Sequence, residues 1–442
     1  MLGKKTVLLT IVLVLCLQLL LPAMSALAEM ETFSLVDLAY GASSIVRGQV
    51  VSVSSQWNAD HTNIFTTVTI AVQSYIKGSG EKEITFQIPG GEVGEIGEWV
   101  EHVPAFAEGE EVVLFLQEGD FPILGWEQGK FTIVDDLVLE SGLLSADAFI
   151  GQIRDILGYP PEAPDLHPER PVAVSLLAPS ITSVSPTSGR AGVNLHVTIN
   201  GNNFGATQGT STVKLWWGGS TTWTTVSGSN IVSWSNTQIV IHLVAPASSH
   251  STQAIKVTVG GSNAYAGFTV KWAKKSYKWP GTCTCVKYYV YANTSDCTGE
   301  ADAVRKGAWA WNNADYHCHH LSYFGSTTRS APTNDGYNVV RWGDLAAGIL
   351  AQCTTWYAGS DIVEFDIVFN DDYNWSTADT CPAGRYDVWD IATHELGHGG
   401  VGLYDLYGTP DSEKTMYGYG ASCETKKRTL HSDDIDAIQY IY

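Results

Sequence analysis

The sequence predicts a multi-domain fold with an N-terminal all-β domain, a β-sandwich in the middle and a C-terminal α+β domain. Charge divides the chain first: residues 29 to 172 hold 24 acids and 6 bases, residues 173 to 272 hold no acid and 4 bases, and residues 273 to 442 hold 22 acids and 13 bases. Apolar residues alternate in short runs through the first two regions and recur at helical spacing in the third. With 442 residues, the chain is long enough for two or three separate cores.

The first 28 residues have the pattern of a secretory signal peptide. Lys4 and Lys5 precede an apolar run over residues 6–21, and the segment SALA ends at Ala28 in an A-x-A cleavage pattern. A membrane anchor is the alternative, but the run is short for a spanning helix. We therefore expect a secreted, extracellular or cell-surface protein with no membrane span after signal cleavage.

Seven cysteines follow the signal segment, and all lie in the last 160 residues, at positions 283, 285, 297, 318, 353, 381 and 423. In an exported protein this clustering predicts disulfides in the C-terminal domain only. Three pairs and one free thiol are expected, with a connectivity that the sequence does not reveal.

The N-terminal domain is expected over residues 29–158. Runs such as IVRGQVVSVSSQW and FTTVTIAVQSYI alternate as strands do, and a short helix is expected over residues 145–157. The Gly-rich segment 89–111 is expected to form a long exposed loop. Residues 159–177 read as a Pro-rich linker. The net charge of −21 argues against a nucleic-acid partner.

The middle domain is expected over residues 178–272, where six or seven alternating strands at short spacing predict a sandwich. Its opening, ITSVSPTSGRAGVNLHVTINGNNFG, resembles that of the immunoglobulin-like IPT/TIG domains. The resemblance implies a spacer or a module that binds a carbohydrate or protein ligand. Four tryptophans are expected to serve core and inter-sheet packing, with a sugar-stacking face as the alternative: Trp216, Trp217, Trp223 and Trp234.

The C-terminal domain, residues 273–442, contains the segment HELGH on a predicted helix. His394 and His398 are four residues apart, so both imidazoles project from one helix face and can bind one zinc ion. Glu395 lies beside the pair, where it can act as the general base on a water molecule activated by the metal.

The third metal ligand is less evident. The pattern H-E-x-x-H-x-x-G-x-x-H would place Gly at 401 and a ligand at 404, where this chain has Val401 and Tyr404. A shift of one residue gives Gly402 and Asp405. We expect one extra residue in the turn at 399–402, with Gly399 and Gly400 at positive φ, and Asp405 as the ligand; Tyr404 is the alternative.

Residues 280–442 resemble the matrixin type of metzincin zinc peptidase. The HELGH helix carries the resemblance, and the segments TMYGYG and HSDDIDAIQYIY support it. It implies that Met416 forms the Met-turn beneath the zinc, that residues near 349–356 form the edge strand for a peptide substrate, and that one catalytic Zn²⁺ is bound.

The chain also departs from the matrixin pattern. Val368 stands where matrixins carry a histidine for a structural zinc, so a second zinc is not expected. Calcium binding through Asp371 or Asp372 is a weak expectation, because a hard-cation site needs several converging oxygen ligands. No cysteine lies between residues 29 and 282, so no thiol of the N-terminal domain can cap the zinc.

The sequence thus predicts a secreted zinc metalloendopeptidase, a hydrolase that cleaves proteins or peptides with Glu395 as general base. The alternative is a surface adhesin or binding protein whose peptidase-like domain is inactive. The N-terminal domain is expected to be an inhibitory pro-segment, a folding chaperone or a permanent binding module.

Overall fold

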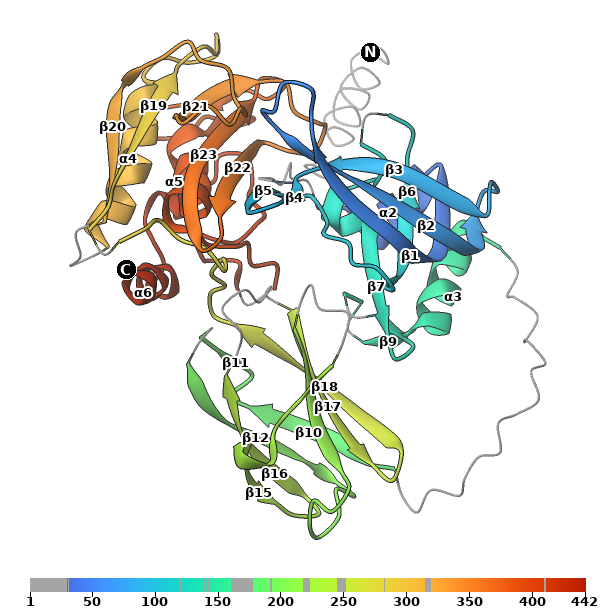
Figure 1. The fold of residues 1–442 in the computed structure, drawn as a ribbon. Coiled ribbons are helices and arrows are strands. Elements are labelled where there is room, and N and C mark those ends of the chain that lie inside the picture. Colours follow the sequence, from blue (N-terminus) through green and yellow to red (C-terminus); the bar gives the residue numbers. More distant parts are fainter. Residues whose placement is uncertain are drawn as a thin grey trace, which may run out of the picture.

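The computed structural model describes residues 30, 32–119, 121–138, 140–141, 143–159, 178–190, 193–217, 223–244, 252–281, 283–314, 319–408 and 411–442. The expected signal segment and residues 160–177 of the expected linker lie outside these ranges. Within them the chain forms three bodies, two of which contribute to one shared sheet (Figure 1). No helix in the described part of the chain has the length and apolar character needed to cross a membrane.

The N-terminal body is a seven-stranded sheet with two helices. Strand order is β3-β2-β1-β6-β7-β8-β9, with bounds Ser44–Trp57 (β1), Ile64–Lys77 (β2), Glu83–Pro89 (β3), Glu111–Leu116 (β6), Lys130–Val134 (β7), Leu137–Val138 (β8) and Leu144–Ser145 (β9). Helix α2 (Leu35–Gly41) begins at a Ser34 capping box, and helix α3 (Ala146–Leu157) begins at Ser145 and ends at Gly158 in the left-handed region. Both helices pack their apolar residues on the sheet.

The middle body consists of two sheets, as the alternating runs predict. One sheet has the order β10-β12-β16-β15 and the other β11-β18-β17-β13-β14. The strands are Ser180–Ser185 (β10), Ser188–Gly189 (β11), Asn194–Asn202 (β12), Thr212–Trp217 (β13), Thr224–Thr225 (β14), Ile231–Trp234 (β15), Gln238–Val244 (β16), Thr252–Val259 (β17) and Ser262–Val270 (β18). Val197, Ile241, Ile255 and other fully buried aliphatic residues of both sheets form its core.

Three of the four tryptophans of the middle body have described side chains, Trp216, Trp223 and Trp234, and these serve packing; the Trp217 side chain lies outside the described part. Trp234 donates its indole N–H to the Phe204 carbonyl at 2.9 Å. Trp216 is buried and forms a small cluster with Trp223 that also contacts Val134 of the N-terminal body. An ion pair between Lys256 and Asp135 lies at the same boundary.

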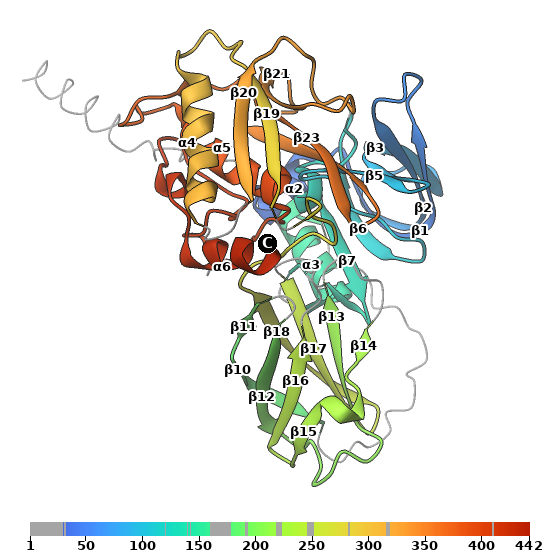
Figure 2. The ribbon, with the colours of Figure 1, turned by 60° about the vertical axis from the view of Figure 1, so that its left-hand side comes forward.

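The C-terminal body combines a mixed sheet with three α-helices. Its own strands are Cys285–Tyr291 (β19), His320–Ser326 (β20), Asn338–Gly343 (β21), Ala351–Ala358 (β22) and Asp361–Asn370 (β23), in the order β20-β19-β21-β23-β22, beside a small β24–β25 pair (Trp375–Ser376 and Tyr386–Asp387). Helices α4 (Glu300–Asn313) and α5 (Val388–Leu396) pack together, and α6 (Ser432–Ile441) ends the chain (Figure 2). Gly307 permits the close approach of α4 and α5, because a Cβ at this position would lie 2.9 Å from the Thr393 nitrogen.

The segment predicted to be an exposed loop, residues 89–111, contains a β-hairpin that joins the C-terminal sheet. Strands β4 (Gly91–Val93) and β5 (Ile96–Val100) extend that sheet beyond β22 (Figure 1). Strand β5 pairs antiparallel with β22, from Ile96 opposite Ala358 to Val100 opposite Thr354. The exposed-loop prediction was therefore wrong, because the hydrogen-bonding partner of this segment is a strand some 250 residues later in the chain.

The three expected disulfide pairs are not formed among the described cysteines, of which Cys283 alone is disulfide-bonded. Five described cysteines carry free thiols, namely Cys285, Cys297, Cys353, Cys381 and Cys423. Cys353 is fully buried on β22, where its sulfur contacts the Thr354 carbonyl and the Thr355 hydroxyl. Spacing along the chain did not reveal this, because pairing depends on how the strands bring the side chains together.

Candidate active site

Helix α5 positions the two histidines. Asp387 caps its N-terminus by accepting a hydrogen bond from the Asp390 nitrogen at 2.8 Å. His394 and His398 are fully buried, and their Nε2 atoms lie 2.9 Å apart. Each ring is fixed by a bond from Nδ1 to a backbone carbonyl, Thr415 at 2.7 Å and Leu403 at 2.8 Å. Because a carbonyl only accepts, Nδ1 carries the proton and each Nε2 presents a lone pair to the site.

A π-helical turn accommodates the extra residue of this motif. Residues Gly397–Val401 form the turn, and it ends at Gly402, whose φ of 95° lies in the left-handed region. A π turn inserts one residue into a helix without breaking it. Positive φ at Gly399 and Gly400 was predicted, but neither residue adopts it. Both are needed for close packing instead: a Cβ would lie 2.5 Å from the Phe365 ring or 2.8 Å from the Leu321 side chain.

Asp405 reaches the histidine pair, and Tyr404 does not. Oδ1 of Asp405 lies 3.1 Å from Nε2 of His394 and 3.5 Å from Nε2 of His398. Its other oxygen accepts a hydrogen bond from the Tyr407 hydroxyl at 3.0 Å. The Tyr404 ring faces Trp99, with the centroids 5.9 Å apart.

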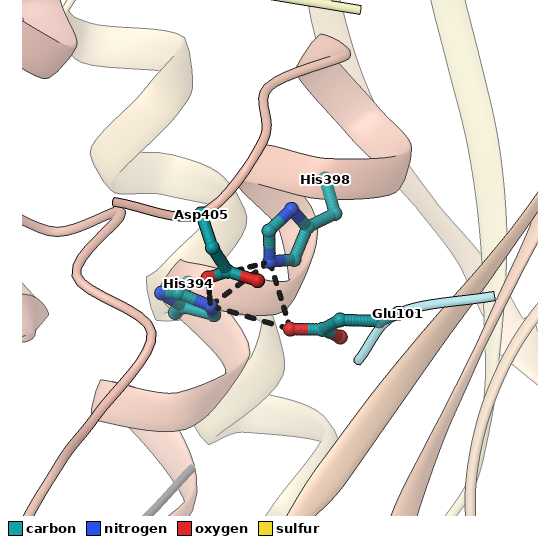
Figure 3. A group of neighbouring side chains, drawn as sticks. All are labelled: Glu101, His394, His398 and Asp405. Carbon is teal, nitrogen blue, oxygen red and sulfur yellow. Dashed lines mark hydrogen bonds and ion pairs between the residues drawn. The ribbon is translucent and has the colours of Figure 1, made fainter. Parts of the chain in front are cut away.

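A fourth side chain, Glu101, enters the site from the N-terminal body (Figure 3). Its Oε1 lies 2.9 Å from Nε2 of His398 and 3.5 Å from Nε2 of His394. Oε2 accepts a hydrogen bond from the Cys353 nitrogen on β22 at 2.8 Å. After Glu101 the chain turns away at His102, whose φ of 62° is left-handed. The β5 segment covers the surface formed by β22 and the metal cluster, which we call the cleft, and Glu101 lies on the side of the cluster that faces this segment.

The cluster has the electrostatics of a cation site. Burial alone would raise the pKa of the Asp405 and Glu101 carboxyls, but the facing imidazoles hold both pKa values well below their usual range. Burial alone would lower the pKa of His398, yet the two carboxylates raise it. Two imidazole nitrogens and two carboxylate oxygens, all within 4.8 Å of one another, converge in a buried space. Such a set of acceptors is stabilised by a metal ion among them, and imidazole with carboxylate ligands suits zinc.

Two further predicted residues lie beside this cluster. Met416 is buried beneath the helix end, where a Cβ on Gly397 would lie 2.3 Å from its sulfur. Glu395 is fully buried and interacts electrostatically with Lys275, as Glu101 and Asp405 do.

The expected calcium site has no support. Among the described residues, two groups of side chains could hold a metal: the cluster above and the adjoining trio of His102, Glu127 and Asp405. Asp371 and Asp372 belong to neither and are exposed. Their place at the end of β23 is that of a solvated acidic turn.

Glu101 was missed by the sequence prediction. The available signal was the run IGEWVEHV, in which apolar residues recur within an acidic segment as they would in a strand. Because the N-terminal domain has no cysteine that could cap the zinc, the sequence did not indicate which of its side chains would approach the metal site.

Two family models match parts of the chain, in the order expected from the sequence. Residues 179–270 match the IPT/TIG domain, and residues 341–442 match matrixin. No curated protein matches the chain.

Solved structures show only weak likeness. A structural genomics protein of unknown function from Bacteroides thetaiotaomicron is 18% identical over 25% of this chain and 25% of that chain, with a TM-score of 0.19. A titin structure is 12% identical over 27% of this chain and 60% of that chain, with a TM-score of 0.17. This chain spans only a quarter of the first structure's length, and scores this low support no conclusion about the fold.

The family matches confirm the resemblance seen in the sequence: the chain contains an IPT/TIG domain followed by a matrixin segment, a family that implies a zinc peptidase.

Proposed function

We propose that the protein is a secreted zinc-dependent endopeptidase that is made in a latent form, with its N-terminal body as the inhibitor. One observation carries the proposal: Glu101, which follows strand β5, completes a cluster of four possible metal ligands with His394, His398 and Asp405. Structural zinc sites have four protein ligands, whereas catalytic sites keep one position open. The same segment also covers the edge of β22, which a peptide substrate would use.

In the open form, His394, His398 and Asp405 would hold the zinc. When bound, the metal supplies a Lewis acid that polarises the scissile carbonyl and lowers the pKa of a water molecule. Glu395 takes the proton from that water and delivers it to the leaving amine. Strand β22 binds the substrate backbone once β5 has left, and Met416 supports the helix end that carries the ligands.

The alternative, an adhesin with an inactive peptidase-like domain, rested on the one-residue shift of Asp405. The π turn removes that support, because it brings Asp405 within 3.1 Å of His394 Nε2. Export remains a proposal that rests on the pattern of residues 1–28.

The test is metal content and casein cleavage, measured on the full chain and on its Glu395→Ala variant after release of the inhibitor by Glu101→Ala. We expect about one zinc per chain in both, and chelator-sensitive cleavage only with Glu395 present. Equal cleavage without Glu395, or no zinc in either protein, would refute the proposal.

A further inference from the structure

Strand β5 fills the cleft with one face only. Gly97 and Trp99 alternate with Glu98 and Val100 along the strand, so the two pairs point to opposite sides. Glu101, the first residue after the strand, still pairs with β22 through its nitrogen, which donates to the Cys353 carbonyl. Glu101 enters the metal cluster, whereas Glu98 accepts a hydrogen bond from the Ile64 nitrogen of the N-terminal body at 2.5 Å. Gly97, Trp99 and Glu101 therefore contact the same surface that a bound polypeptide substrate would contact.

The Trp99 ring lies in a cage of aromatic rings with a cation. The Lys275 ammonium lies 3.3 Å from the centre of the Trp99 ring. The rings of His398 and Tyr404 flank it, at centroid distances of 5.4 and 5.9 Å. Trp99 itself is half-buried, opposite Thr355 of β22.

Lys275 belongs to the permanent wall of the cleft. Its backbone nitrogen donates to the Gly402 carbonyl at 2.8 Å, and its ammonium donates to the Thr355 hydroxyl at 3.2 Å. The side chain is fully buried while β5 is in place. A cation held over an aromatic ring is attracted by the electron-rich face of that ring, and the attraction is stronger where water is excluded. When β5 leaves, this cation and the rings around it remain as a subsite.

A second contact concerns Gly97, two residues before Trp99 on the same face of β5. A Cβ on Gly97 would lie 2.1 Å from Cζ of Tyr357, whose ring is stacked on Tyr277 at a centroid distance of 3.8 Å. A side chain here must displace the Tyr357 ring, whereas glycine needs no such movement. The cleft thus accepts a small residue at the Gly97 position and an aromatic residue at the Trp99 position, two residues later.

We propose that the space filled by Trp99 is a specificity subsite of the peptidase, with Lys275 as its specificity-determining residue. The subsite takes an aromatic side chain two residues before the residue that lies at the metal, and it favours substrates of the pattern glycine, any residue, aromatic. This inference rests on the proposed peptidase function, whose substrate class it names.

The test uses the full chain carrying Glu101→Ala, so that the cleft can open. Fluorogenic peptides with the sequence of residues 95–103 carry Ala at the Glu101 position and Trp, Phe, Ala or Glu at the Trp99 position. We expect kcat/KM for the Trp and Phe peptides to exceed that for the Ala peptide by about tenfold. Adding Lys275→Met should reduce this ratio to about threefold, and Lys275→Arg should preserve it.

Binding of the same labelled peptides, followed by fluorescence polarisation, separates the two proposals. Tighter binding of the Trp peptide without cleavage of any peptide or of casein would support the subsite and refute the peptidase. Casein cleavage with equal kcat/KM for the Trp and Ala peptides would refute the subsite and leave the peptidase standing. A preference for Glu over Trp would also refute it, because charge alone would then decide.

Discussion

Under the proposed function, removing the Glu101 carboxylate should convert a latent form into an active one. In Glu101→Ala, the segment loses the hydrogen bond to the Cys353 nitrogen and its contacts with both histidines. Charge-assisted buried contacts of this kind are worth about 2–4 kcal/mol, which corresponds to a rise of about 30- to 1,000-fold in the population with an open site. Pairing of β5 with β22 remains, so activation should be large but incomplete.

The assay compares chelator-sensitive casein cleavage and zinc content in three full chains: the parent, Glu101→Ala and Glu98→Gln. Glu98 is the matched control because it lies on the same strand and points the other way, toward the Ile64 nitrogen. We expect low activity in the parent and in Glu98→Gln, and high activity in Glu101→Ala with zinc retained through the other three ligands. A parent as active as Glu101→Ala would refute the reasoning, since Glu101 would then not hold the site closed.

Three further predictions follow from the site. Asp405→Ala should lower zinc content well below one per chain, whereas Tyr404→Phe should retain it, as mass spectrometry of the native proteins would show; retention in both would exclude Asp405 as a ligand. Gly399→Ala should destabilise the protein by about 1–3 kcal/mol, because the new Cβ would lie 2.5 Å from the Phe365 ring; an unchanged midpoint in urea would contradict this packing argument. Burial raises the pKa of Glu98 to about 7, above its value in the unfolded chain. Its protonation therefore stabilises the fold fully at low pH, and the stabilisation is lost as pH rises through 7. The unfolding free energy of the parent should thus fall between pH 5 and pH 8 relative to Glu98→Gln, and parallel profiles would show that Glu98 does not titrate in this range.

Local sequence patterns predicted much of the architecture. Alternating apolar residues predicted strands such as β1 and β12, and the segment 145–157 predicted the helix α3. Such elements depend on residues adjacent in the sequence and on the pattern of one buried face, and a short stretch of sequence contains both. The hairpin in segment 89–111 was not predicted, because its strand pairs with a strand far away in the sequence and no neighbouring residues indicate that partner.

The sequence by itself determined that two imidazoles and a carboxyl share one helix, since a spacing of four residues places His394 and His398 on one face whatever surrounds them. The sequence also indicated two candidates for the third metal ligand, Asp405 as the expected one and Tyr404 as the alternative, without deciding between them. Only the tertiary structure decided that a π turn brings Asp405 to the histidines, and that Glu101 meets them from another body of the protein. Helical geometry repeats every few residues, whereas the convergence of four ligands depends on how separate sheets pack, and no short stretch of sequence contains that information.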